Sequence, residues 1–433
     1  MKKILITLIL IIPTLGFGQG FQNTFGGDSL DMGYSVQQTN DGGYVLTGST
    51  NSYGNGDSDV YLIKTDGNGD SLWTRTFGGE NQDYCNSVQQ TTDGGYIITG
   101  RTESYGAGNK DVYLIKTDGN GDSLWTKTFG GTSFDNGISV QQTNDGGYII
   151  LGGTESYGAG NRDIYLIKTD GNGDSLWTKT FGGASQDFGN SVKQTNDGGY
   201  IVTGVTESYG AGNKDAYLIK TDASGDSLWT KTFGGLKFDL GNFVEQTDDG
   251  GYIVTGRTAS FGAGSLDIYL IKTDGNGDLL WAKTFGGSSF DLGFSLQQTT
   301  DGGYIIIGGT DSYGSGDRDV YLIKTDVNGD LIWAKTFGGS GFDLGTSIQQ
   351  TTDGGYIILG GTDSFGNGDR DLLLIKADGN GNITSIFDVS TLNPNRKLER
   401  IVDLLGREIK PQPNTLFIEI YDDGTITKKI IVE

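Results

Sequence analysis

Short runs of hydrophobic residues, bounded by glycine, aspartate and asparagine, recur along the whole middle of the chain. In the copy that begins at Trp73, these runs are Trp73–Phe77, Ser87–Thr91, Tyr96–Gly100 and Asp111–Lys116. The first run alternates large and polar residues, the third is apolar on both faces, and none has helical spacing, which favours β-strands. Asp-Gly-Gly and Asp-Gly-Asn-Gly-Asp supply tight turns after the second and the fourth run. We therefore predict four antiparallel strands in each copy.

This pattern is written seven times with a period of 52 residues and without insertion or deletion. A unit of this size cannot bury its apolar faces alone and must stack on its neighbours. Apolar runs such as Tyr304–Ile307 need cover on both sides of their sheet, which radial stacking provides. We predict an all-β fold, a seven-bladed β-propeller with four-stranded antiparallel blades. The aspartate of Asp-Gly-Gly-Tyr marks the register, at Asp41, Asp93, Asp145, Asp197, Asp249, Asp301 and Asp353.

The ends of the repeat array predict how the ring closes. Tight hairpins keep their two strands in one sheet, so the tryptophan strand is the outermost strand of the preceding blade. The array begins with such a strand, Phe21–Phe25, and its last copy ends with Asp371–Lys376 and has Ser385 where a tryptophan would fall. We predict that Phe21–Phe25 completes the last blade. Phe21 then stands in register with the six tryptophans, Trp73, Trp125, Trp177, Trp229, Trp281 and Trp333.

The beginning of the chain differs from the repeats in composition. Two lysines precede an apolar run, Ile4–Ile12, and small residues follow at Gly16 and Gly18. This is the pattern of a secretory signal peptide, which we place at residues 1–18. The run is too short to span a bilayer, and no other stretch approaches ~18 consecutive apolar residues. We expect residues 19–386 to form the propeller and the mature chain to have no transmembrane segment.

The tail, residues 387–433, contains all the prolines that follow the leader and few glycines. Arg400–Ile409 predicts a strand, a turn and the start of another strand. Thr415–Tyr421 and Thr425–Val432 flank the turn residues Asp422–Gly424 and predict a hairpin. We expect the tail to be a separate small β-domain.

The residues before each outer-strand tryptophan carry a resemblance. Asp66–Trp73 resembles the tryptophan-docking repeat of quinoprotein-type β-propellers, in which an aspartate and a glycine precede the tryptophan. The spacing is one residue shorter here, and the resemblance covers about a dozen residues in each copy. It implies the same fold. It implies no quinone cofactor, because nothing in the sequence matches the quinone-binding or calcium-binding residues of those dehydrogenases.

The tail is similar to the C-terminal sorting domain of type IX secretion substrates. The residues that carry the resemblance are Asn393–Pro394, Val402–Arg407, Ile420–Gly424 and Lys428–Glu433. The resemblance implies passage across an inner membrane by the leader and across an outer membrane by the tail. It implies the type IX machinery as a partner and an extracellular or outer cell-surface location, with the tail commonly removed. The alternative is a small docked β-domain without a sorting role.

Charge and residue types exclude several functions. The formal net charge is −23, and the acidic excess lies in the repeats because the tail from Val389 is balanced. Such a surface repels phosphate backbones, so we expect no nucleic-acid partner. Histidine is absent, which removes Ser-His-Asp and Cys-His catalysis and the usual ligand of zinc. We interpret the one cysteine, Cys85, as a small buried apolar residue, with a reactive thiol as the alternative.

Turns such as Asp66–Asp70 place oxygen ligands at alternate positions, as calcium-binding loops do. Ser71 stands where those loops need glycine, however, and no glutamate follows at the twelfth position. We expect no cofactor, with the aspartates capping backbone amides, and keep calcium as an alternative.

Three further columns of side chains repeat in every copy. The two aspartate columns either line the axial channel and bind cations or sugars, or satisfy turn amides in every blade. The aromatic column either forms a multivalent platform on one face or plugs the gaps between blades. The first aspartate column follows the double glycine, at Asp31, Asp83, Asp135, Asp187, Asp239, Asp291 and Asp343. The second opens the fourth strand, at Asp59, Asp111, Asp163, Asp215, Asp267, Asp319 and Asp371. The aromatic column is Tyr53, Tyr105, Tyr157, Tyr209, Phe261, Tyr313 and Phe365.

Near-identical repeats offer little of the asymmetry that catalysis uses, so we assign no catalytic, cofactor-binding or metal-binding residue. The sequence favours a secreted or cell-surface, non-enzymatic binding or adhesion module with a glycan or protein ligand. The alternatives are a secreted polysaccharide-active enzyme and a calcium-dependent scaffold, each using one face of the ring.

Overall fold

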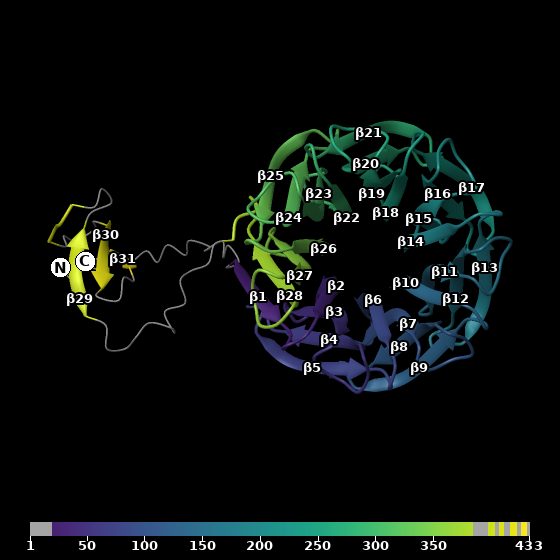
Figure 1. The fold of residues 1–433 in the computed structure, drawn as a ribbon, viewed down its shortest axis with the longest axis horizontal. Coiled ribbons are helices and arrows are strands. Elements are labelled where there is room, and N and C mark those ends of the chain that lie inside the picture. Colours follow the sequence, from purple (N-terminus) through teal and green to yellow (C-terminus); the bar gives the residue numbers. More distant parts are fainter. Residues whose placement is uncertain (1–19, 384–396, 403–406, 411–415, 422–425, 431–433) are drawn as a thin grey trace, which may run out of the picture. The chain divides into compact units, whose positions relative to one another are not determined.

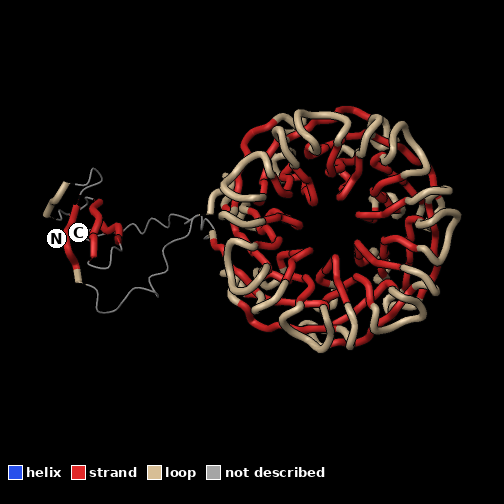
Figure 2. Tube along the Cα trace, in the orientation of Figure 1, coloured by secondary structure: helices blue, strands red, loops and turns tan. Residues whose placement is uncertain are grey.

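The computed structural model describes residues 20–383, 397–402, 407–410, 416–421 and 426–430. The chain divides into two compact units, Met1–Thr384 and Ser385–Glu433. The regular secondary structure of the described residues consists of β-strands (Figure 2). Within this described part, no helix has the length and apolarity needed to cross a membrane. The predicted signal peptide lies outside the described residues.

Seven four-stranded antiparallel sheets form a closed ring around one axis (Figure 1). The innermost strands are β2 (Asp31–Gln38), β6 (Asp83–Gln90), β10 (Asp135–Gln142), β14 (Asp187–Gln194), β18 (Asp239–Gln246), β22 (Asp291–Gln298) and β26 (Asp343–Gln350). The second strands are β3 (Tyr44–Thr50), β7 (Tyr96–Thr102), β11 (Tyr148–Thr154), β15 (Tyr200–Thr206), β19 (Tyr252–Thr258), β23 (Tyr304–Thr310) and β27 (Tyr356–Thr362).

The third strands are β4 (Asp59–Thr65), β8 (Asp111–Thr117), β12 (Asp163–Thr169), β16 (Asp215–Thr221), β20 (Asp267–Thr273), β24 (Asp319–Thr325) and β28 (Asp371–Ala377). The outermost strands of the first six blades are β5 (Ser71–Phe77), β9 (Ser123–Phe129), β13 (Ser175–Phe181), β17 (Ser227–Phe233), β21 (Leu279–Phe285) and β25 (Leu331–Phe337). The predicted all-β, seven-bladed fold and its four strands per blade are confirmed.

The ring closes through its first strand, β1 (Phe21–Phe25). β1 pairs antiparallel with β28, and Phe21 lies opposite Lys376. The seventh sheet therefore has the order β1-β28-β27-β26 and joins the two ends of the repeat array. Phe21 holds the register position that Trp73 holds opposite Lys64 in the first blade. The predicted closure is confirmed.

The hydrophobic core lies between neighbouring blades. One of its clusters joins Val45 and Leu62 of the first blade to Cys85, Ile98 and Ile115 of the second. The second and third strands of the first blade are buried along their whole length, because each sheet packs against a neighbour on both faces. Continuous apolar runs are what such doubly covered strands require.

Each outer-strand tryptophan contacts the next blade. The ring of Trp73 packs edge-on against Tyr96, with 5.9 Å between the ring centroids. A Cβ atom added to Gly121, in the turn after β8, would lie 2.5 Å from the same indole, and Gly121 has a φ of +79°. Glycine is therefore required there for both space and backbone conformation. Phe21 packs in the same way against Tyr44, with 6.1 Å between the centroids.

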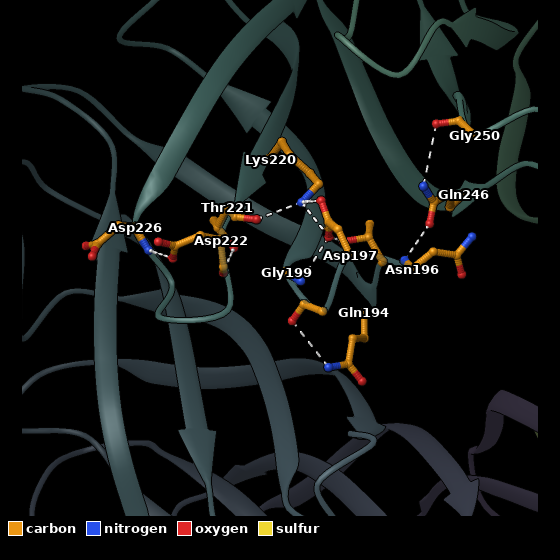
Figure 3. A network of polar contacts seen from close by, with 12 residues as sticks. Gln194, Asn196, Asp197, Gly199, Lys220, Thr221, Asp222, Asp226, Gln246 and Gly250 are labelled. Atoms are coloured by element: carbon orange, nitrogen blue, oxygen red, sulfur yellow. Dashed lines mark hydrogen bonds and ion pairs between the residues drawn. The ribbon is translucent and has the colours of Figure 1, made fainter.

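A buried lysine holds each Asp-Gly-Gly turn. In the fourth blade, Nζ of Lys220 lies 2.9 Å from Oδ2 of Asp197, and the lysine side chain is 4% exposed while that of the aspartate is 59% exposed (Figure 3). Lys220 also donates a hydrogen bond to the carbonyl of Thr221. Oδ1 of Asp197 accepts hydrogen bonds from the Thr195 hydroxyl and from the backbone N–H of Gly199. The same ion pair occurs in all seven copies.

The second unit contains a three-stranded antiparallel sheet. Its central strand is β30 (Leu416–Tyr421), which pairs with β29 (Leu398–Val402) and with β31 (Ile426–Ile430). The strand and the hairpin predicted in the tail are therefore confirmed. Between these strands, residues 403–406, 411–415 and 422–425 lie outside the described residues, whereas residues 407–410 are described and Glu408 forms an isolated antiparallel bridge with Val402.

Candidate functional site

The seven inner strands surround an axial channel. Their side chains enclose two adjoining cavities, with volumes of about 190 Å³ and about 280 Å³. Both cavities are lined by one level of small hydroxyl side chains and by a phenyl ring in the fifth blade. These shared residues are Ser35, Ser87, Ser139, Ser295, Ser347 and Phe243.

In six of the seven blades, one side chain of the inner strand accepts a hydrogen bond from a backbone N–H of the next inner strand. The backbone N–H of Gln90 donates a hydrogen bond of 2.6 Å to Oε1 of Gln37 in the preceding blade. The first and seventh blades are linked in the same way, because the N–H of Gln38 donates to Oε1 of Gln349 over 2.6 Å. Edge N–H groups that would otherwise need solvent or another chain are thus paired within the ring.

This pairing determines which end of each glutamine faces the cavity. A backbone N–H can donate to the amide oxygen only, so the amide nitrogen Nε2 is left as a free donor at the wall. Five blades contribute such a glutamine to the 190 Å³ cavity. They are Gln37, Gln89, Gln141, Gln297 and Gln349.

Two neighbouring blades break the pattern. Lys193 of the fourth blade and Glu245 of the fifth replace the glutamine, and Phe243 replaces the serine. Oε2 of Glu245 still accepts the N–H of Gln298 over 2.8 Å. Lys193 has no acceptor to offer the N–H of Gln246, and its Nζ lies 5.0 Å from the centroid of the Phe243 ring. The channel is therefore asymmetric at this level.

Burial acts on both charges of the wall. It lowers the pKa of Lys193, an effect that the negative charge of Glu245 opposes. Burial also raises the pKa of Glu245, while the hydrogen bond from the N–H of Gln298 and the charge of Lys193 lower it. The wall thus combines one ammonium, one carboxylate, several amide donors and one aromatic ring, which suits the binding of a polar molecule.

The 280 Å³ cavity is lined by Tyr34 and Phe294 together with three asparagines. The amide nitrogens of Asn86, Asn190 and Asn242 each donate a hydrogen bond to a glycine carbonyl of the next blade. These nitrogens are used by the ring itself, in contrast to the free glutamine nitrogens of the smaller cavity.

Neither aspartate column lines the channel cavities. Asp83 is buried, and its Oδ2 accepts hydrogen bonds from the N–H of Gly79 over 2.9 Å and from the hydroxyl of Ser104 over 2.6 Å. Asp59 is buried as well and accepts hydrogen bonds from two N–H groups of its own loop. The interpretation as a channel lining is wrong, because both columns begin strands at the loop end of the blade. The interpretation as caps for turn amides is confirmed.

The Asp66–Asp70 turn is closed by its own hydrogen bonds. Oδ1 of Asp66 accepts the N–H groups of Asn68 and Asp70, each over 2.9 Å. The capping role is confirmed. Calcium binding at these turns stays a prediction.

The aromatic column lies on loops within the blades. The hydroxyl of Tyr105 donates a hydrogen bond of 2.9 Å to the carbonyl of Gly78, in the segment that enters the blade. Its ring packs against Tyr113, with 5.8 Å between centroids, and the residue is 47% exposed. These contacts fix the ring within its own blade and to the segment that leads into it, so the plug between blades and the platform both stay predictions.

Cys85 is fully buried in the core cluster between the first two blades. Its thiol lies 2.8 Å from the hydroxyl of Thr47 and donates to the carbonyl of Gly48. Burial raises the pKa of the Cys85 thiol to about 12. The interpretation as a buried structural residue is confirmed.

The asymmetric wall formed by Lys193, Phe243 and Glu245 is not among the sites predicted from the sequence. The signal was present in the sequence, because five of the seven copies have glutamine where Lys193 and Glu245 stand. Residues shared by all copies indicate the blade architecture, whereas a departure from a shared column indicates a position where one blade differs from the others.

Comparisons with known proteins place few limits on function. No family model matches the chain. Regulatory protein FlaEY of Caulobacter vibrioides is 25% identical over 228 residues, which are 45% of this chain and 24% of FlaEY. The chain thus spans about a quarter of the length of that curated relative.

Among solved structures, the Neurospora crassa Pan2 WD40 domain is similar with a TM-score of 0.49 and 10% identity, over 85% of this chain and 98% of that one. Sqt1 from Chaetomium thermophilum has a TM-score of 0.48 and 12% identity, over 96% of this chain and 100% of its own. The fold assignment rests on the strand order and closure described above.

Proposed function

We propose that this protein is an exported, non-enzymatic binding module that acts at the outer cell surface or outside the cell. The observation that carries the proposal is the preformed axial cavity of about 190 Å³, whose polar groups are held in position by hydrogen bonds between blades. Ligand sites are commonly concave, preformed and equipped with a few oriented polar groups. The blades are linked at the rim by the pairing of β1 with β28 and around the channel by hydrogen bonds between inner strands, so the ring is a rigid support for such a site.

The wall of the channel favours binding over hydrolysis. Polysaccharide hydrolysis generally uses two carboxyl groups in different roles. Among the described residues that line the two cavities, Glu245 is the one carboxylate. The whole sequence also lacks histidine, the commonest general base near neutral pH.

The two ends of the sequence support the export part of the proposal. Residues 1–18 have the charge and hydrophobicity pattern of a secretory leader. The tail motifs that resemble type IX sorting domains support an interaction of the second unit with that secretion machinery.

Binding without turnover is the expected behaviour of the purified full chain. We expect saturable binding to at least one glycan or extracellular protein in an array, confirmed by calorimetry, with no new products in chromatography of the incubated ligand. Release of product that stops in the Glu245→Gln variant would instead identify an enzyme. Absence of any partner in the screen would contradict the proposal.

Deletion of Asn393–Glu433 is expected to retain the protein in the periplasm of its native cell. The ring should stay folded, with a melting temperature unchanged within about 2 °C, because the repeats form their own compact unit. Cell fractionation and thermal unfolding of the purified variant measure the two effects. Secretion of the truncated chain at the normal level would show that the tail has no sorting role.

A further inference from the structure

The smaller cavity presents many more hydrogen-bond donors than acceptors. Five glutamines direct a free amide nitrogen to the wall, because each amide oxygen is bonded to the next blade. Lys193 adds an ammonium group. The one carboxylate, Glu245, already has one oxygen bonded to the N–H of Gln298. A ligand that matches such a wall must itself be rich in acceptor atoms.

Lys193 also stands where the ring would be better satisfied by glutamine. A glutamine there would accept the N–H of Gln246, as Gln141 accepts the N–H of Gln194 over 2.7 Å. The ammonium cannot accept this bond and is itself partly removed from water. Residues that break a local rule at a cost in stability are characteristic of functional sites. Glu245 supplies one negative charge for this ammonium, and a negatively charged ligand in the cavity would supply a second.

Phe243 shapes the surroundings of this ammonium. It stands in a column that is serine in the other six blades, and its ring lies 5.0 Å from Nζ of Lys193. The ring displaces water from one side of the ammonium, which strengthens the interaction of that charge with an anion. Phe243 lines both cavities.

We propose that the axial cavity binds an oxyanion group, a carboxylate, sulfate or phosphate, with Lys193 as its counter-charge and the glutamine amide nitrogens as its hydrogen-bond donors. The group is free or borne on a small polar molecule such as an acidic sugar, since the cavity holds about 190 Å³. This site is the binding site of the proposed function, and the inference presupposes that role. The acidic outer surface does not prevent binding, because its field is screened over about 8 Å at physiological ionic strength.

Calorimetric titration of the full chain tests the proposal, with sodium sulfate, sodium phosphate and sodium glucuronate as probes at constant ionic strength. Glucose serves as the uncharged counterpart of glucuronate. We expect at least one oxyanion to bind with a Kd below about 1 mM and glucose to bind at least about tenfold more weakly. Binding of sulfate or phosphate would indicate a free anion, and binding of glucuronate alone would indicate an acidic sugar.

The decisive variant is Lys193→Gln, which introduces the residue that five of the six other copies have at this position. We expect it to weaken oxyanion binding at least about tenfold, the usual effect of losing a charge-assisted hydrogen bond. Its melting temperature should stay close to that of the wild type, because the N–H of Gln246 gains an acceptor while buried Glu245 loses the charge of Lys193. Glu245→Gln should strengthen binding, since it removes the competing negative charge. Lys179→Gln removes an equal charge from an exposed ion pair with Asp226 on the rim and should leave binding unchanged.

Three outcomes would overturn the proposal. They are no heat of binding with any of the three oxyanions, equal binding by the Lys193→Gln variant, and equal losses in the Lys193→Gln and Lys179→Gln variants. If oxyanions fail while the array screen finds a partner, the site assignment fails and the proposed binding function stands. If both fail, the proposed function fails as well.

Discussion

A chain that lacks residues 21–25 is expected to lose about 5 kcal/mol of unfolding free energy or to fail to fold. Those residues form β1, the outermost strand of the seventh blade, and all five pair with β28. Phe21 and Phe25 pack against the apolar cluster between the seventh and first blades. Removing two partly buried phenyl rings and a row of ladder hydrogen bonds accounts for this magnitude. Total stabilities of domains are typically ~5–15 kcal/mol, so the loss is a large fraction.

Thermal unfolding measures this effect, and we expect a fall of about 10 °C or a loss of the cooperative transition. Phe21→Trp is a matched control, because Trp73 makes the equivalent contacts with Tyr96 and Gly121 in the next blade. It should melt at or above the wild-type temperature. Gln22→Ala changes an exposed position of the same strand and should have little effect. An unchanged transition in the deletion variant would show that the ring does not depend on its first strand.

The closure of the ring was predictable from sequence because it depends on register alone. A first strand without a preceding blade and a last copy without its tryptophan strand leave one consistent arrangement, and Phe21 opposite Lys376 is that arrangement. The strand boundaries were predictable because the apolar runs are continuous and the turns contain glycine. Gly94 illustrates this point, since its φ of +84° is one that other residues rarely adopt.

The candidate site was harder to predict because its geometry depends on the whole ring. The sequence of a single repeat does not show which side chains from the seven blades lie close together at the axis. Asp83 and Gln89 are both polar residues of the same inner strand, yet one is buried in a loop network and the other lines the channel. The difference arises from the direction of each side chain relative to the axis. The burial of Lys220 was likewise not predictable from the sequence, because a charged residue at the end of an apolar run is usually exposed to solvent.

The Asp197→Ala substitution is expected to destabilise the ring by about 3 kcal/mol. Lys220 keeps its ammonium buried and retains the carbonyl of Thr221 but loses its counter-ion. A buried charge without its partner is strongly destabilising, typically by ~3–5 kcal/mol. The opposite substitution, Lys220→Met, should be much milder, because Asp197 is 59% exposed and can be solvated by water. Urea unfolding at neutral pH measures both changes.

Asp226→Ala provides the surface control for this experiment. Its partner Lys179 lies 2.7 Å away, and the two side chains are 66% and 34% exposed. Exposed ion pairs contribute ~0–1 kcal/mol, so this variant should be nearly neutral. Equal effects of Asp197→Ala and Asp226→Ala would show that burial of Lys220 does not matter.

The dependence of stability on pH tests the same ion pairs independently. Burial raises the pKa of Asp197, but the hydrogen bonds from Lys220, Thr195 and the N–H of Gly199 and the charge of Lys220 outweigh it and lower the pKa to about 2. The unfolded chain has a pKa of about 3.9 at this residue. Asp197 is therefore protonated less readily in the folded state than in the unfolded chain. The stabilisation that the charged Asp197 contributes to the fold is complete above pH ~4 and disappears as the pH falls towards ~2. The difference in unfolding free energy between the wild type and Asp197→Ala should shrink over the same range. A difference that stays constant down to pH ~2 would show that the ion pair is not its source.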